Sequence, residues 1–289
     1  MKKLLLSAFV ICLAGTSIAQ ESPLWMRHCA LSPDGTTIAF TYKGDIYTVP
    51  STGGRATQIT TNPAFDTEPV WSPDSKQIAF ASDRMGSLDV FVVSSEGGTP
   101  QRLTTHSGSE KPVAYKDSKH ILFTANIAPS AEDAGFPSGQ FQQVYEVAVT
   151  GGRPAMFSSM PMECISINKE GVMLYQDKKG YEDYWRKHQV SPIARDIWTY
   201  TPGKKPVYQK QTTFGGEDRE PVWSPDGKSF YYLSEEKGSF NIFQRTPGTT
   251  TSQQITFHTK HPVRFLSIST TGTLCYGYDG EIYTLTPGK

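Results

Sequence analysis

The chain has 289 residues, which is enough for one large β domain or two ordinary domains with a substantial buried core. Lysine plus arginine and aspartate plus glutamate number 28 each, so there is no net charge to attract nucleic acid or an anionic membrane. The composition therefore argues against a nucleic-acid partner.

The N-terminus has the pattern of a secretory signal peptide. A pair of lysines precedes an apolar run from Leu4 to Leu13, and Ser17 and Ala19 place small residues at the two positions that a signal peptidase recognises. The run is shorter than the roughly 18 apolar residues of a spanning helix, and no later segment reaches that length. We expect residues 1–19 to be cleaved and residues 20–289 to be periplasmic, without a membrane span.

The cysteines of the mature chain do not form a recognisable framework. Cys29, Cys164 and Cys275 are far apart in sequence and none belongs to a CxxC pair. An odd number with such spacing indicates neither a set of disulfides nor a zinc site. We expect all three to be small buried side chains.

One phrase recurs six times along the mature chain. Each copy begins with a hydrophobic residue, continues into a turn of the Ser-Pro-Asp-Gly type and ends in β-branched and aromatic residues. Successive copies are 40 to 56 residues apart. Their turns are centred on Asp34, Asp74, Asp117, Glu170, Asp226 and Thr271.

Each repeat predicts four short strands. In the turn, proline favours the φ of a type I turn, the aspartate side chain bonds nearby amides and glycine permits positive φ, so the turn joins a first strand to a second. A phrase such as Asp-Ile-Tyr-Thr-Val follows in every copy and predicts the third strand. A turn and a fourth strand close five repeats, whereas the sixth stops at Lys289.

Four antiparallel strands repeated in this way are typical of the blade of a β-propeller. We therefore predict an all-β fold, a six-bladed β-propeller of four-stranded antiparallel blades over residues 20–289, whose last blade lacks its outer strand. The blades start near residues 27, 68, 111, 163, 220 and 263. Trp71 and Trp223 are expected to pack between neighbouring blades. The outer strand of the sixth blade would come from residues 20–25 or from further sequence. Otherwise the ring would stay open.

The blades resemble those of the TolB and tricorn class of propellers. Three longer stretches strengthen the resemblance: residues 23–49, 180–200 and 261–285. The first and last are similar to the first propeller of bacterial tricorn protease homologues, and the middle one looks like the long fourth-blade insertion of tricorn-type proteases. The resemblance covers essentially all of the mature chain.

The resemblance also implies a function. In that family the propeller is followed by a second propeller, a PDZ-like domain and peptidase domains that carry the catalytic serine and histidine, and none of those positions falls in this sequence. It implies a non-catalytic propeller of a secreted tricorn-like serine protease, a hydrolase, that gates peptide substrate or product and contacts the downstream domains or other subunits. The alternative is a free-standing TolB-like periplasmic scaffold that binds proteins.

The sequence carries no familiar catalytic motif of its own. It has no nucleophile elbow, no HExxH, no phosphate-binding loop and no dinucleotide fingerprint. Only His258 and His261 are close together among the histidines, and no cysteine or carboxylate stands beside them. We expect no catalytic residue, no metal and no cofactor in this chain.

Two excess-length connections are predicted on one face of the propeller. Residues 127–140 in blade three and 178–195 in blade four both lie between the second and third strands of their blades. The second insertion is a candidate interface loop, because it mixes the cationic and aromatic side chains enriched at protein interfaces. The other interpretation is a solvated loop with its own small cluster. The candidate residues are Tyr184, Trp185, Arg186, Lys187, His188 and Arg195.

A second candidate region is the mouth of the central channel. Charged residues stand at or just before the first strand of most blades: Arg27, His28, Glu68, Glu110, Glu163, Glu220 and Arg264. A ring of mixed sign would suit the capture or passage of peptides with charged ends. The favoured interpretation is that these charges pair with one another and fix the starts of the strands.

Overall fold

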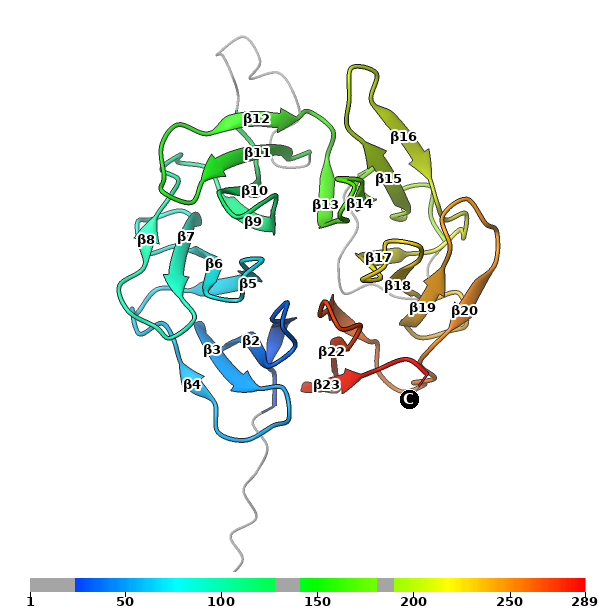
Figure 1. Ribbon diagram of the computed structural model, residues 1–289, viewed down its shortest axis with the longest axis horizontal. Helices are drawn as coiled ribbons and strands as arrows, with labels where there is room; N and C mark the ends of the chain where they lie inside the picture. The colour runs from blue at the N-terminus through cyan, green and yellow to red at the C-terminus, as the bar shows by residue number, and fades with distance from the viewer. Residues whose placement is uncertain (1–23, 128–140, 181–189, 289) are drawn as a thin grey trace, which may run out of the picture.

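The computed structural model describes residues 24–127, 141–180 and 190–288, which form a ring of six blades (Figure 1). Every regular element in these ranges is a β-strand, and the innermost strand of each blade stands nearest the axis of the ring. The predicted six-bladed propeller is therefore confirmed.

The blades follow one another in chain order, and each runs from its inner strand outward. The first three comprise β1 (Arg27–Leu31), β2 (Thr37–Tyr42), β3 (Asp45–Pro50), β4 (Thr57–Gln58); β5 (Asp66–Trp71), β6 (Gln77–Ser82), β7 (Asp89–Ser94), β8 (Gln101–Arg102); and β9 (Glu110–Tyr115), β10 (His120–Ala125), β11 (Gln143–Ala148), β12 (Ala155–Ser158). The last three comprise β13 (Met162–Ile167), β14 (Met173–Asp177), β15 (Ile197–Thr201), β16 (Val207–Lys210); β17 (Asp218–Trp223), β18 (Phe230–Ser234), β19 (Asn241–Arg245), β20 (Ser252–Gln254); and β21 (Arg264–Ile268), β22 (Leu274–Tyr278), β23 (Glu281–Leu285). Blade six has three strands among the described residues, as predicted.

The repeated turn is built by its serine and aspartate. Oδ1 of Asp34 accepts a hydrogen bond from Ser32 Oγ at 2.6 Å and another from the amide of Thr36 at 3.0 Å. Asp74 and Asp226 accept the same serine hydrogen bond in their own turns. The hydrogen bond from the serine lowers the pKa of each of these carboxyls. These aspartates hold turns, as the sequence predicts.

Two tryptophans join neighbouring blades. Nε1 of Trp71 donates to the carbonyl of Ala30 in blade one at 2.8 Å, and Nε1 of Trp223 donates to the carbonyl of Val172 in blade four at 3.0 Å. Both indoles are 7% exposed. Because each ring buries a large apolar surface and satisfies its one donor, it stabilises the contact between two blades. The predicted packing of the tryptophans is confirmed.

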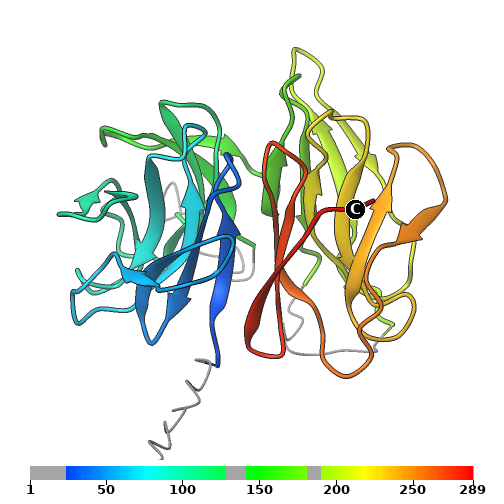
Figure 2. The same cartoon turned by 60° about the horizontal axis from the view of Figure 1, so that its bottom comes forward.

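Blade one and blade six meet directly and close the ring, and Figure 2 shows them side by side. The amide of Leu31 donates to Ser267 Oγ at 3.0 Å, and the amide of Met26 donates to the carbonyl of Gly280 at 3.2 Å. Residues 24 and 25 are not part of a strand, so the described residues add no fourth strand to blade six.

The three cysteines differ in their surroundings. Cys29 and Cys275 are buried in one cluster between the first and last blades, as predicted. Cys164 is exposed, so the prediction of its burial was wrong. It lies on β13, the innermost strand of blade four, at a residue with a φ of 51° in a register irregularity. A β-bulge re-aims the side chain that it contains, which separates Cys164 from the packed layers between blades.

Candidate functional site

The two candidate regions lie on the same face of the ring. Each first strand begins opposite the end of the second strand, as the pairs Glu110 with Ala125 and Met162 with Asp177 show. The connections between second and third strands, which include both insertions, therefore emerge beside the starts of the inner strands. Residues 128–140 and 181–189 lie outside the described residues. So do five candidate interface residues: Tyr184, Trp185, Arg186, Lys187 and His188.

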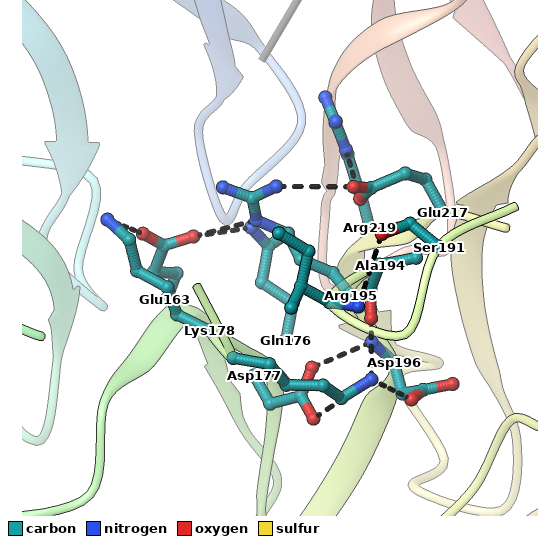
Figure 3. Close-up of polar contacts among 12 residues, drawn as sticks. Glu163, Gln176, Asp177, Lys178, Ser191, Ala194, Arg195, Asp196, Glu217 and Arg219 are labelled. Carbon is teal, nitrogen blue, oxygen red and sulfur yellow. Dashed lines mark hydrogen bonds and ion pairs between the residues drawn. The ribbon is translucent and has the colours of Figure 1, made fainter. Parts of the chain in front are cut away.

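The base of the fourth-blade insertion is closely tied. The amide of Asp177 donates to the carbonyl of Asp196 at 3.0 Å, and the amide of Asp196 donates to Asp177 Oδ1 at 2.8 Å. Nζ of Lys179 contacts the carbonyl of Ala194 at 2.5 Å and also the carboxylate of Asp196 (Figure 3). The two ends of the insertion are thus bound to each other.

Arg195 connects this base to the inner strands. Its side chain is 5% exposed, with Nε 3.1 Å from Glu163 Oε2 and Nη1 3.4 Å from Glu217 Oε1. Glu217 in turn accepts a hydrogen bond from Arg219 Nε at 2.8 Å. Figure 3 shows Arg195 between the two glutamates. A residue predicted for the interface loop and one predicted for the channel mouth therefore form one ion pair.

The surroundings of Glu163 and Arg195 favour the charged form of each. Burial alone would raise the pKa of Glu163, but the charges of Arg195 and Lys178 and the amide of Gln176 outweigh it, so the pKa is lowered. Burial likewise opposes the charge of Arg195, and the carboxylates of Glu163 and Glu217 outweigh burial and raise its pKa. Glu163 and Arg195 therefore stay ionised around neutral pH.

On the inner strands of the first three blades, polar groups pair across blades. Nζ of Lys111 lies 2.7 Å from Glu68 Oε1, and His28 Nδ1 lies 3.1 Å from Thr67 Oγ1. The ring of His28 also contacts that of Phe265, with centroids 4.8 Å apart. Burial, together with the charges of Lys111 and Arg27, lowers the pKa of His28, although Glu68 opposes this. His28 is therefore neutral at pH 7.

Two of the predicted channel-mouth residues are buried. Oε2 of Glu220 accepts a hydrogen bond from the amide of Leu266 in the next blade at 2.8 Å. Glu110 is fully buried, and the amide of His106 donates to its Oε2 at 3.3 Å. Each carboxylate thus holds a backbone amide in place. The amide held by Glu220 belongs to the next blade, and the amide held by Glu110 belongs to the connection between blades two and three. Arg27 is exposed, and the other candidates are half-buried: His28, Glu68, Glu163 and Arg264.

Sequence reasoning missed part of the network. Glu217 stands just before β17 in the segment Glu-Asp-Arg-Glu-Pro, and the predicted channel mouth did not include it. The available signal was the high density of charge in a segment that begins a buried strand, where charges must be paired. The partner of Glu217, Arg195, is 22 residues away along the chain.

Across residues 24–127, 141–180 and 190–288, no group of three or more histidine, cysteine, aspartate or glutamate side chains is arranged to hold a metal ion. Nor does this part of the chain contain a helix long and apolar enough to cross a membrane.

Comparison with known proteins identifies the family. Residues 23–289 match the tricorn protease N-terminal beta propeller domain. The chain belongs to this family. It is 39% identical over 260 residues to tricorn protease homolog 1 of Streptomyces coelicolor, covering 88% of this chain and 23% of that protein. The resemblance found in the sequence is therefore confirmed.

Solved structures share the tricorn-type propeller fold. The crystal structure of the tricorn protease matches with a TM-score of 0.75 and 17% identity, over 92% of this chain and 25% of that one. TolB from Acinetobacter baumannii matches with a TM-score of 0.64 and 15% identity, over 89% of this chain and 65% of that one. The chain spans about a quarter of the length of the tricorn proteins that it matches.

Proposed function

We propose that this chain is the non-catalytic propeller of a secreted tricorn-like serine protease, where it gates peptide substrate or product and contacts the other domains or subunits. One observation carries the proposal: nearly the whole chain matches the N-terminal propeller family, yet it spans about a quarter of its tricorn relatives. The peptidase chemistry would belong to the remaining length of such a protein.

The fourth-blade insertion is the part that we assign to contact with a partner. Its base is fixed by Asp177, Lys179 and Asp196, and the buried Arg195 binds the inner strand. A rigid base lowers the entropy that a loop loses when it binds, so Tyr184, Trp185 and Arg186 would be presented at lower cost. Arg195 would act by holding the loop, because its own side chain is buried.

The charged groups near the axis are the part that we assign to peptides. Arg27 is exposed, and Glu68 and Arg264 are half-buried. Charges of both signs would attract either end of a peptide, and ion pairs such as that of Glu68 with Lys111 are only moderately strong at a wet surface. Transient, weak binding of this kind suits passage.

Export is the remaining part of the proposal. Residues 1–19 have the composition of a cleaved signal, and delivery to the periplasm would place the propeller where extracytoplasmic peptides are found. The alternative, a free-standing TolB-like scaffold in the same compartment, shares the fold but would act without a peptidase.

A proteolysis assay tests the non-catalytic part of the proposal. Residues 20–289 are purified and incubated with a reduced, unfolded protein, with and without a serine-directed inhibitor. We expect no hydrolysis, because no serine, histidine and acid are predicted to act together in this chain. Robust cleavage that the inhibitor abolishes, from a preparation free of contaminating protease, would overturn it.

A further inference from the structure

Blades two and five carry the same buried aspartate. Asp66 begins β5 opposite Ser82, and Asp218 begins β17 opposite Ser234. Asp66 is 0% exposed and Asp218 is 1% exposed. Because both strands continue with the same Glu-Pro-Val-Trp sequence, the two aspartates are structural counterparts in two copies of one blade.

In blade two the aspartate is neutralised by an arginine from the same blade. Nη2 of Arg84 lies 2.9 Å from both carboxylate oxygens of Asp66, and Nε donates to Ser82 Oγ at 2.8 Å. The guanidinium also lies over the rings of Phe91, at 4.5 Å, and Phe80, at 5.4 Å. Carboxylate, hydroxyl and aromatic faces together form a complete site for a planar guanidinium.

In blade five the arginine is absent. Glu236 follows Ser234 by two residues, as Arg84 follows Ser82, so a carboxylate stands where blade two has the cation. Within the part of the chain that the structure describes, neither side-chain oxygen of Asp218 has a hydrogen-bond partner. Burial raises the pKa of Asp218 to about 7, although the hydroxyls of Ser234 and Thr212 oppose the rise.

A cavity of about 450 Å³ opens beside this aspartate. It is lined by Asp218, Tyr232 and Glu236, the counterparts of Asp66, Phe80 and Arg84, and by Phe214 from the connection between blades four and five. Glu236 is exposed at the rim. The cavity therefore combines a deep unpaired carboxylate, a second carboxylate nearer to solvent and aromatic walls.

Three other polar side chains of the wall already have partners. Tyr232 Oη and Ser252 Oγ are 2.8 Å apart, and Nε of Arg245 donates to the carbonyl of Thr249 at 2.9 Å. Asp218 is the buried carboxylate of this wall, and only the nearby hydroxyls of Ser234 and Thr212 offset its burial. Such a group costs free energy until a cation or a hydrogen-bond donor reaches it.

We propose that this cavity is a binding site for an alkylguanidinium group, the side chain of an arginine in another polypeptide. The arginine would supply from outside the cation that Arg84 supplies from within blade two. Guanidinium fits better than ammonium, because a planar fork can bond both oxygens of Asp218 while it stacks on the ring of Tyr232. The site does not depend on the proposed function, and its failure would leave the family assignment intact.

Titration of the full chain with N-acetyl-arginine amide tests the proposal. Saturable binding is expected by calorimetry or by NMR shifts, and the neutral isostere N-acetyl-citrulline amide should not bind. The D218N variant should weaken binding by roughly thirtyfold, because a buried charged partner is lost. As a matched control, E96Q removes an exposed carboxylate of blade two and should change nothing. Absence of binding, or equal binding by citrulline or by D218N, would overturn the proposal.

A second variant keeps the test independent of any loss of folding. E236R places the blade-two arginine at its counterpart in blade five, where it should fill the cavity, prevent binding of the probe and raise the melting temperature. Binding of the probe to folded E236R with unchanged affinity would show that the cavity is not the site.

The pH dependence gives a third readout. Asp218 must be ionised to bind a cation, so affinity should rise by up to roughly tenfold between about pH 6 and pH 8. The charged groups that face Asp218 are Asp196 and Glu236, which oppose its ionisation, and Arg245 across the cavity. An affinity that does not change over this range would contradict a role for Asp218.

Discussion

Arg195 Nε lies 3.1 Å from Glu163 Oε2, which joins the end of the fourth-blade insertion to the innermost strand of its own blade. The two residues are 32 positions apart, and each also has a second charged partner, Glu217 for Arg195 and Lys178 for Glu163. These contacts hold the end of the insertion against the innermost strand.

Removal of Arg195 should destabilise the propeller. The R195A variant leaves Glu163 and Glu217 without their shared cation, and breaking a buried pair costs about 3 to 5 kcal/mol in the free energy of unfolding. The matched K178A variant removes a cation from the more open side of Glu163 and should cost less than about 1 kcal/mol. Urea denaturation of both measures the difference, and equal losses would contradict a special role for Arg195.

The tip of the insertion should matter for binding more than for folding. Replacing Trp185 and Arg186 together with alanine should leave the melting temperature nearly unchanged, because the base is held by other residues. The variant should bind a peptidase partner more weakly in co-purification with the rest of a tricorn-like protein. A collapse of thermal stability in this double variant would make the loop structural.

Blades two and five offer a paired test of the buried aspartates. R84M leaves Asp66 buried without its cation and should cost about 3 kcal/mol in the free energy of unfolding. E236M changes the counterpart position in blade five, which is exposed, and should change stability by less than about 0.5 kcal/mol. Chemical denaturation of the two variants compares one position in two copies of the repeat, and similar losses would contradict the structural difference.

Stability should fall as pH rises toward neutrality. Burial, with a smaller effect of Asp89, raises the pKa of Glu110 from its ordinary value of 4.5 to about 7. Between these values the folded chain binds more protons than the unfolded chain, so the free energy of unfolding decreases as pH increases. The raised pKa of Asp218 also makes the free energy of unfolding decrease as pH increases.

The E110Q variant isolates this effect. Glutamine resembles the protonated carboxyl, so the variant should match the wild type near pH 4.5 and gain up to about 3 kcal/mol over it by pH 7.5. Denaturation at several pH values measures the difference. A constant difference across this range would mean that folding does not change the pKa of Glu110.

The fold could be predicted because short sequence motifs specify its turns and strands. The turn aspartates Asp34, Asp74 and Asp226 act within two residues of their serines, and the strands that follow are short apolar runs that the sequence displays directly. Repetition then supplied the architecture, since a repeat of this length and strand content has few ways to bury its faces. The three strands of blade six among the described residues also match the pattern of the last repeat.

The site was harder to predict because its contacts cross between blades. Nothing local to Glu220 signals that its carboxylate is buried against the backbone of the next blade, 46 residues away. Cys164 was misjudged for a related reason, because its exposure depends on a bulge on the innermost strand. The unpaired Asp218 emerges only when blade five is compared with blade two in three dimensions.

The central claim is that this chain is the propeller of a longer tricorn-like protease, and the most direct measurement is the coding sequence that follows the codon for Lys289. The account predicts that the reading frame continues, first into an outer strand for blade six and then into further domains that include a peptidase. A stop codon at that point would contradict it and leave a free-standing propeller whose role is to capture a partner.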